Sequence, residues 1–226
     1  MTTSTTFCTP PVPYEVPPMP ERPWVQRALP VAGAVYVLAW LAGLLVAPTT
    51  PGTADAGAVH EFFTASADAF MRQALLVHGL AGLALVGLTL GFAVAVGRGR
   101  AGRWIAGTGV AAAGVSLVQI GLGLAAAHDV AHASASTTTS WLQAVNVADV
   151  AKLLLLAAFA AVTTRAAGRA GRLPRWLSLL GWFLVPLLAV GGFAFLVPTP
   201  ALTVVLTASL PALLAWAGAA AWRLRH

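Results

Sequence analysis

The sequence predicts an all-α membrane protein, a six-helix transmembrane bundle with both termini on the cytoplasmic side. The first observation is composition: of 226 residues, 58% are hydrophobic and only 9% are charged, and the mean hydropathy is +0.82. Soluble domains do not have this composition. Hydrocarbon offers the backbone no hydrogen-bond partner, so a spanning segment must be a helix or part of a closed barrel, and long unbroken apolar runs select the helix.

The second observation is the number and length of the apolar runs. Crossing a hydrocarbon core of about 30 Å takes about 20 helical residues. The runs that meet this length are 28–47, 73–96, 104–127, 145–164, 176–197 and 201–222. Before them, residues 1–23 contain seven prolines, which predicts a disordered cytoplasmic tail. Residues 24–226 are then one transmembrane domain.

The third observation is the uneven distribution of charge. Of the 13 basic residues, only Arg72 and Lys152 lie toward one side of the predicted bundle, and the others flank the opposite side. Basic residues mark cytoplasmic segments. The arginine-bearing segments near residues 22–27, 98–103, 165–175 and 223–225 are therefore predicted to be cytoplasmic. Residues 48–72, 128–144 and 198–200 are predicted to be loops outside the membrane, and the location is the bacterial cytoplasmic membrane.

Charge and cysteine content narrow the classes of partner. The net charge of +6 is carried by short arginine clusters beside apolar runs, without the interleaved aromatic residues of nucleic-acid binding, so no nucleic-acid partner is expected. Cys8 is the single cysteine, which excludes a disulfide within the chain. The lipid bilayer is the expected partner, and a homo-oligomer or another membrane protein is compatible with the chain.

The fourth predicted helix carries the most informative polar residues. Gln143, Asn146, Asp149 and Lys152 recur at every third position, and Lys152 and Asn146 are the only lysine and the only asparagine. An ionisable residue at membrane depth is a functional-site hypothesis by default. The alternative is an ion pair between Asp149 and Lys152, with the lysine stem reaching toward the interface. Both interpretations stay open here.

Other predicted spans place polar residues at a similar depth. His78 lies on the second helix and Gln119 on the third. We expect an outward-facing polar pocket between the second, third and fourth helices, formed by His78, Gln119, Asn146, Asp149 and Lys152. The sequence contains no phosphate-binding loop, nucleophile elbow or metalloprotease motif, so catalytic residues stay unknown.

A metal site is a weaker hypothesis. His128 and His132 have the i,i+4 spacing that lets two imidazoles reach one metal, and His60-Glu61 lies in the first outer segment. The alternative is that His128 and Asp129 lie at a helix end exposed to water at the membrane interface. His78 is the one histidine well inside a span, which does not favour haem, and no cofactor is expected.

Two prolines fall near the middle of predicted spans. Pro186 and Pro211 each remove a backbone donor, which predicts helix bends and leaves the carbonyls of Trp182 and Thr207 without that partner. Such carbonyls line pathways in some transporters, whereas neighbouring helices accommodate most membrane prolines.

Four short segments carry a resemblance to a known group of proteins. They are Ala-Trp-Leu-Ala-Gly-Leu at 39–44, Val77-His78-Gly79, the segment from Asp149 to Lys152, and Leu173-Pro174-Arg175-Trp176-Leu177. With them, roughly residues 28–222 resemble a broad family of multi-pass membrane proteins of high-GC Gram-positive bacteria. The resemblance implies architecture and location, and it implies no activity.

Three functions are compatible with these features. The first is a non-enzymatic accessory, sensing or assembly protein whose buried ion pair fixes helix packing. The second is a small proton-coupled permease that uses Asp149, Lys152 and His78 as titrating groups. The third is a membrane enzyme acting on a lipid or isoprenoid substrate through histidines and acids.

Overall fold

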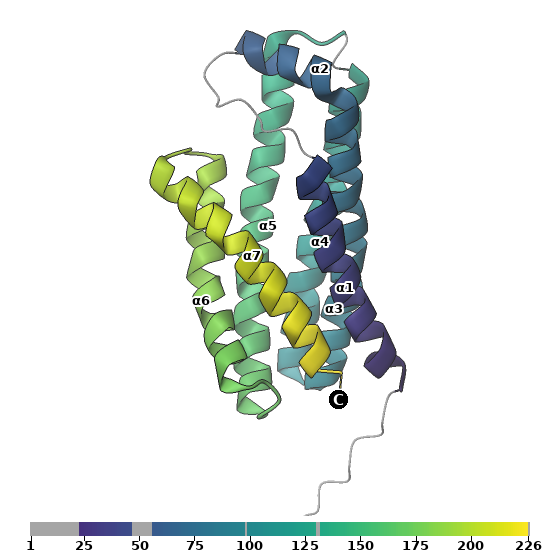
Figure 1. Cartoon of the computed structure of the whole chain (residues 1–226), viewed down its shortest axis with the longest axis vertical. Helices are drawn as coiled ribbons and strands as arrows, with labels where there is room; N and C mark the ends of the chain where they lie inside the picture. Colours follow the sequence, from purple (N-terminus) through teal and green to yellow (C-terminus); the bar gives the residue numbers. More distant parts are fainter. Residues whose placement is uncertain (1–22, 47–55, 98, 130–131, 226) are drawn as a thin grey trace, which may run out of the picture.

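The protein is a bundle of long helices that run roughly side by side (Figure 1). The structure is a computed structural model, and it describes residues 23–46, 56–97, 99–129 and 132–225. Within these residues every regular element is helical, which confirms the predicted all-α class. The proline-rich tail predicted over 1–23 lies outside the described residues, except that Pro23 already begins the first helix.

The helices follow one another in the order expected from the apolar runs. They are α1 (Pro23–Val46), α2 (Ala56–Ala74), the π-helix η1 (Leu75–Leu80), α3 (Ala81–Val96), α4 (Arg100–Asp129), α5 (Ala135–Arg169), α6 (Arg175–Gly191), the 3₁₀-helix η2 (Gly192–Phe195) and α7 (Pro200–Arg223). Elements α2, η1 and α3 form one continuous helical segment, Ala56–Val96. The described residues thus contain six helical segments long and apolar enough to cross a membrane, as predicted.

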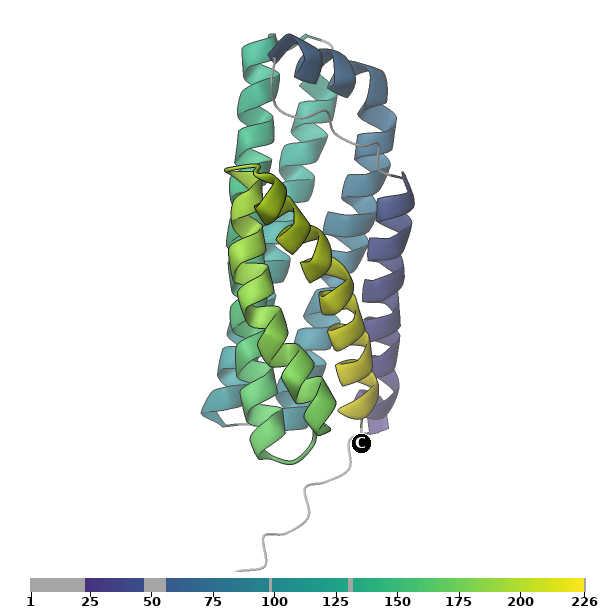
Figure 2. The ribbon, with the colours of Figure 1, turned by 60° about the vertical axis from the view of Figure 1, so that its left-hand side comes forward.

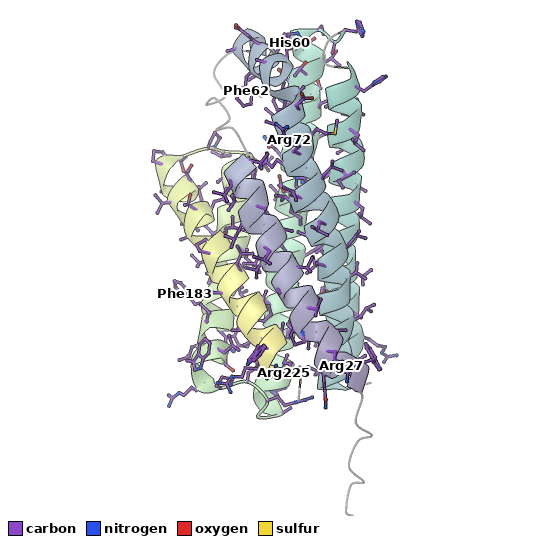
Figure 3. The ribbon with its side chains drawn as sticks, turned by 45° about the vertical axis from the view of Figure 1, so that its right-hand side comes forward. Arg27, His60, Phe62, Arg72, Phe183 and Arg225 are labelled. Carbon is purple, nitrogen blue, oxygen red and sulfur yellow. The ribbon has the colours of Figure 1, made fainter. Side chains whose placement is uncertain are left out.

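Large apolar side chains cover the outside of the bundle. Leu45 is 89% exposed and Val204 is 69% exposed, and Phe183 projects outward from α6 (Figure 3). In water, so many exposed apolar side chains would be unfavourable, but lipid tails are as apolar as these residues. The spans therefore sit in a lipid bilayer.

The interior of the bundle is packed by aromatic and aliphatic side chains. Phe92 of α3 stacks on Phe159 of α5 with ring centroids 5.8 Å apart, and Trp216 of α7 contacts both rings edge-on. All three side chains are fully or almost fully buried. This aromatic group joins three spans that are distant in the sequence.

Three elements extend beyond the rest at one end of the bundle, where α2, α4 and α5 rise above the ends of α1, α6 and α7 (Figures 1 and 2). We call this part the helical extension; it comprises α2 and the adjoining ends of α4 and α5. Val59 and Phe63 of α2 form a small apolar core there, with Leu142 of α5 packed against them. His60 Nδ1 and Thr138 Oγ1, 2.9 Å apart, add a hydrogen bond between α2 and α5.

The helical extension corrects the predicted outer segments. Much of 48–72 and 128–144 was expected to be loop, but α2 begins at Ala56 and α5 begins at Ala135. The Ser134 hydroxyl accepts a hydrogen bond from the Thr137 amide and caps the start of α5. A backbone kink at Ser66, with φ −119° and ψ 16°, lets the first half of α2 turn across the ends of its neighbours.

The opposite end of the bundle collects the arginine-bearing turns. The start of α1, the turn from α3 to α4, the turn from α5 to α6 and the end of α7 all lie there (Figure 2). We call it the arginine end. Arg27 and Arg225 lie at this end, whereas Arg72 and His60 lie at or near the helical extension (Figure 3). The described ends of the chain are therefore on the same side of the bundle.

Candidate functional site

The side chain of Lys152 is the centre of a polar cluster inside the bundle. It projects from α5, and the whole residue is only 2% exposed. Its ammonium nitrogen lies 2.6 Å from Oδ1 of Asp149, three residues earlier on the same helix. It also donates a hydrogen bond of 2.8 Å to Oε1 of Gln119 on α4 and lies 3.3 Å from Nδ1 of His78 on η1. These four residues are called the Lys152 cluster below.

The number of partners matches the number of donors. A lysine ammonium has three N–H donors and no acceptor, and Asp149, Gln119 and His78 supply one acceptor atom each. For Nδ1 of His78 to accept, the imidazole must carry its proton on Nε2. With a neutral His78, the cluster contains one positive and one negative charge and has no net charge.

The π-helical turn η1 positions His78. Segments of this type are rare, and they occur frequently at functional sites. The residues on either side of His78 pack tightly on two different helices. Val77 contacts Gly43 of α1 so closely that a Cβ on Gly43 would overlap it, and a Cβ on Gly79 would lie 2.7 Å from Cδ1 of Ile120. The backbone around His78 is thus held between α1 and α4.

Gln119 links α4 to α5 through both ends of its amide. The Oε1 atom accepts from Lys152, and Nε2 donates to the carbonyl oxygen of Val145 at 3.4 Å. Gln119 is only 1% exposed, so both polar atoms need partners inside the protein. Removing this side chain would leave a donor of the Lys152 ammonium on α5 without its partner.

Trp40 of α1 completes the surroundings of the ammonium group. The Lys152 nitrogen lies 5.7 Å from the centroid of the Trp40 ring, within the range of a cation–π interaction. Trp40 was not among the predicted site residues. The available signal was an aromatic residue near the outer end of the first span, but nothing in the sequence indicated which face of α1 meets α5.

The cluster lies near the level at which α1 ends and α5 continues into the helical extension. Counting at about 1.5 Å per residue, α5 continues for roughly 26 Å beyond Lys152 into the helical extension, whereas α1 ends roughly 9 Å beyond Trp40. The α6–α7 connection packs at the same level, since a Cβ on Gly192 would lie 3.4 Å from Cβ of Leu153. The cluster therefore sits where the helical extension joins the six-span bundle.

Asn146 is not brought to the ammonium group with the other predicted residues. The contacts of Lys152 go to Asp149, Gln119 and His78. Each residue of a helix rotates about 100° around the helix axis, so side chains three positions apart differ in direction by about 60°. Asn146 thus points about 120° away from Lys152, and Gln143 points to the opposite face. That the other four residues form a functional site stays a prediction.

The residues proposed for a metal site are spread over the helical extension. Helix α4 ends at Asp129, and His132 lies in a turn beyond it, so the helical i,i+4 spacing assumed for His128 and His132 does not exist. His60 bonds to Thr138, and Glu61 is exposed. Within the described part of the chain, no three histidine, cysteine, aspartate or glutamate side chains gather to hold a metal ion.

The two central prolines lie inside uninterrupted helices. Pro186 is within α6 and Pro211 is within α7. The helix that ends irregularly is α6, which tightens into η2 after Gly191. The predicted bends at these prolines stay a prediction.

Comparison with known proteins assigns neither a family nor a function to the chain. No family model, no curated protein and no solved structure matches the chain.

Proposed function

We propose that this chain is a non-enzymatic accessory protein of the bacterial cytoplasmic membrane, with a sensing or assembly role. Both termini and the arginine end face the cytoplasm, because basic segments remain on that side. The helical extension then lies on the outer side of the membrane. In this arrangement the Lys152 cluster connects the membrane bundle with the part of the protein that meets external partners or signals.

The observation that carries the proposal is the complete pairing of Lys152. Each of its donors has an acceptor, and the acceptors come from α5, α4 and η1. A catalytic or substrate-binding lysine needs a donor directed at its substrate. An ammonium group whose donors all meet protein atoms is suited to holding three helical segments in one arrangement.

A proton-coupled permease is the second candidate, and a specific observation favours it. An imidazole lies beside a carboxylate–ammonium pair within a membrane protein, which is a combination found in proton relays. His78 also lies in a π-helical turn, an element that occurs frequently at functional sites. In this case Asp149 would exchange protons with the outer side.

Proton flux into vesicles separates the two functions. The full-length protein is reconstituted into liposomes that contain a pH-sensitive dye, a pH gradient is imposed, and Asp149→Asn is compared with the natural protein. The accessory function predicts flux no greater than in protein-free liposomes for both proteins. Flux that exceeds this background and is lost in Asp149→Asn would overturn the proposal in favour of the permease.

A further inference from the structure

A basic cavity lies at the arginine end, far from the Lys152 cluster. Its volume is about 490 Å³, which is within the range of small-molecule pockets. It is bounded by the α5–α6 turn on one side and by the end of α7 on the other. The lining residues are Gly171, Arg172, Pro174, Trp222, Arg223 and Arg225.

The turn on one side of the cavity is fixed by its backbone. The Arg172 amide donates to the Ala167 carbonyl at 2.9 Å, and the Gly171 amide donates to the Gly168 carbonyl at 3.0 Å. This is the Schellman pattern of helix termination, which needs a left-handed residue, and Gly171 has φ +67°. The Arg172 guanidinium also donates to the carbonyl of Ala95 at the end of α3. The turn is therefore tied to a neighbouring span.

The other side of the cavity combines an arginine with an aromatic ring. The guanidinium carbon of Arg225 lies 3.5 Å from the centroid of the Trp222 ring, so the two groups are in cation–π contact. A guanidinium carries its N–H donors in a planar fork that matches the geometry of phosphate oxygens. Trp222 is 55% exposed and stands at the end of a span, where tryptophan marks the membrane interface.

The charged side chains among the described lining residues are all basic. Three of the described lining residues are arginines and none is acidic. The acidic side chains that the structure describes, Glu61, Asp68 and Asp149, belong to the helical extension or to the Lys152 cluster. Arginine recognises phosphate oxygens through paired N–H donors, and basic pockets between spans at the cytoplasmic side bind anionic lipid headgroups.

We propose that this cavity binds the phosphate headgroup of an anionic phospholipid. Phosphate chemistry follows from the arginines. A lipid source, rather than a soluble phosphate, follows from the position of the cavity at the end of two spans. Two exposed tryptophans, Trp176 and Trp222, stand on those spans at the same end. The site is independent of the function proposed for the Lys152 cluster.

The test measures binding of single lipids to the full-length protein in a neutral detergent. Micelles of a neutral detergent have no negatively charged surface. An arginine outside the cavity therefore does not strengthen lipid binding through attraction to such a surface. Phosphatidylglycerol and phosphatidylcholine are titrated separately, and native mass spectrometry counts bound lipids. Inorganic phosphate is a third arm, and the shift in melting temperature is measured for it and for phosphatidylglycerol. The variants are Arg223→Gln alone and Arg223→Gln with Arg225→Gln.

The matched control removes the same charge at the same end of the bundle. Arg100 and Arg103 at the start of α4 are exposed and do not line the cavity, so Arg100→Gln with Arg103→Gln is the control. We expect phosphatidylglycerol to bind the natural protein and the control equally. The single variant should weaken binding about fivefold and the double variant about thirtyfold. Because Arg223 is exposed, the single variant stays informative if the double variant does not fold.

Three results would overturn the proposal. One is equal binding of phosphatidylglycerol by the natural protein and the Arg223→Gln variant. The second is a shift in melting temperature with inorganic phosphate as large as the shift with phosphatidylglycerol, because the ligand would then be a soluble phosphate. Binding of phosphatidylcholine as strong as that of phosphatidylglycerol would also contradict an anionic headgroup site.

Discussion

The ammonium nitrogen of Lys152 lies 2.6 Å from the carboxylate of Asp149, one helical turn away on α5. Both residues are inside the bundle, where the side chain of Lys152 is 3% exposed and that of Asp149 is 14% exposed. A pair of charges at this depth loses its hydration, and it is stable only if further hydrogen bonds compensate. Gln119 and His78 provide these bonds from two other elements.

Gln119→Leu is expected to destabilise the protein by about 1–3 kcal/mol, because it leaves one donor of Lys152 unpaired in a buried site. The free energy of unfolding in mixed detergent micelles measures this change. Val118→Leu, at a neighbouring position of α4 that is 59% exposed, is the matched control and is expected to be neutral. An unchanged unfolding free energy in Gln119→Leu would show that its bond to Lys152 contributes nothing.

His78 is expected to be a neutral imidazole with its proton on Nε2, because Nδ1 accepts from Lys152. The nitrogen chemical shifts of ¹⁵N-histidine-labelled protein distinguish the two ring nitrogens. The chain has five histidines, and comparison with His78→Gln identifies the signal. A proton found on Nδ1 would be incompatible with the observed contact.

Gly181→Ala is expected to cost about 1–3 kcal/mol through overpacking. A Cβ at Gly181 would overlap the hydroxyl of Thr164 and lie 2.7 Å from Nε1 of Trp216, so three spans would have to separate. Gly114→Ala is the control, because its Cβ meets nothing within 4 Å, and it should be neutral or slightly stabilising. Equal melting temperatures for the two variants would contradict the close packing of α5, α6 and α7.

The proposed orientation predicts which cysteines a membrane-impermeant maleimide can label in intact cells. Cys8 is the single natural cysteine, so Cys8→Ser provides a background free of thiols. Ser136→Cys, in the exposed start of α5, should be labelled from outside, and Gly99→Cys, at the arginine end, should be labelled only after cell lysis. Labelling of Gly99→Cys in intact cells would place the arginine end outside.

The span number and helical class followed from composition and run length, but the helix ends did not. Apolar runs report only the part of a helix that meets lipid, whereas α5 begins at Ala135, ten residues before the predicted start, in a segment rich in serine and threonine. The sequence signal for α2 was available: Val59, Phe63 and Phe70 recur at spacings of four and seven residues, which is typical of an amphipathic helix. It was missed because this segment is too polar to span.

Asp149 and Lys152 could be paired from the sequence because they share a helix face. His78 and Gln119 were expected near them from their depth alone. Their contacts with Lys152 depend on how three elements rotate against one another, which sequence spacing does not determine. The π-helical turn at Leu75–Leu80 is likewise not visible in the sequence. Asn146 was included because residues at every third position were taken to share one helix face. Each step of three residues rotates the side chain by about 60°, so residues several steps apart no longer share a face.

The most direct test of this account is a double-mutant cycle with Lys152→Met, Asp149→Leu and both changes together, measured as the free energy of unfolding in mixed micelles. Each single variant leaves a buried charge without its partner and is expected to lose about 3–5 kcal/mol, whereas the double variant should regain most of that loss. A double variant that loses as much as the two single variants added together would contradict the central claim that Lys152 and Asp149 form one buried, mutually neutralising unit.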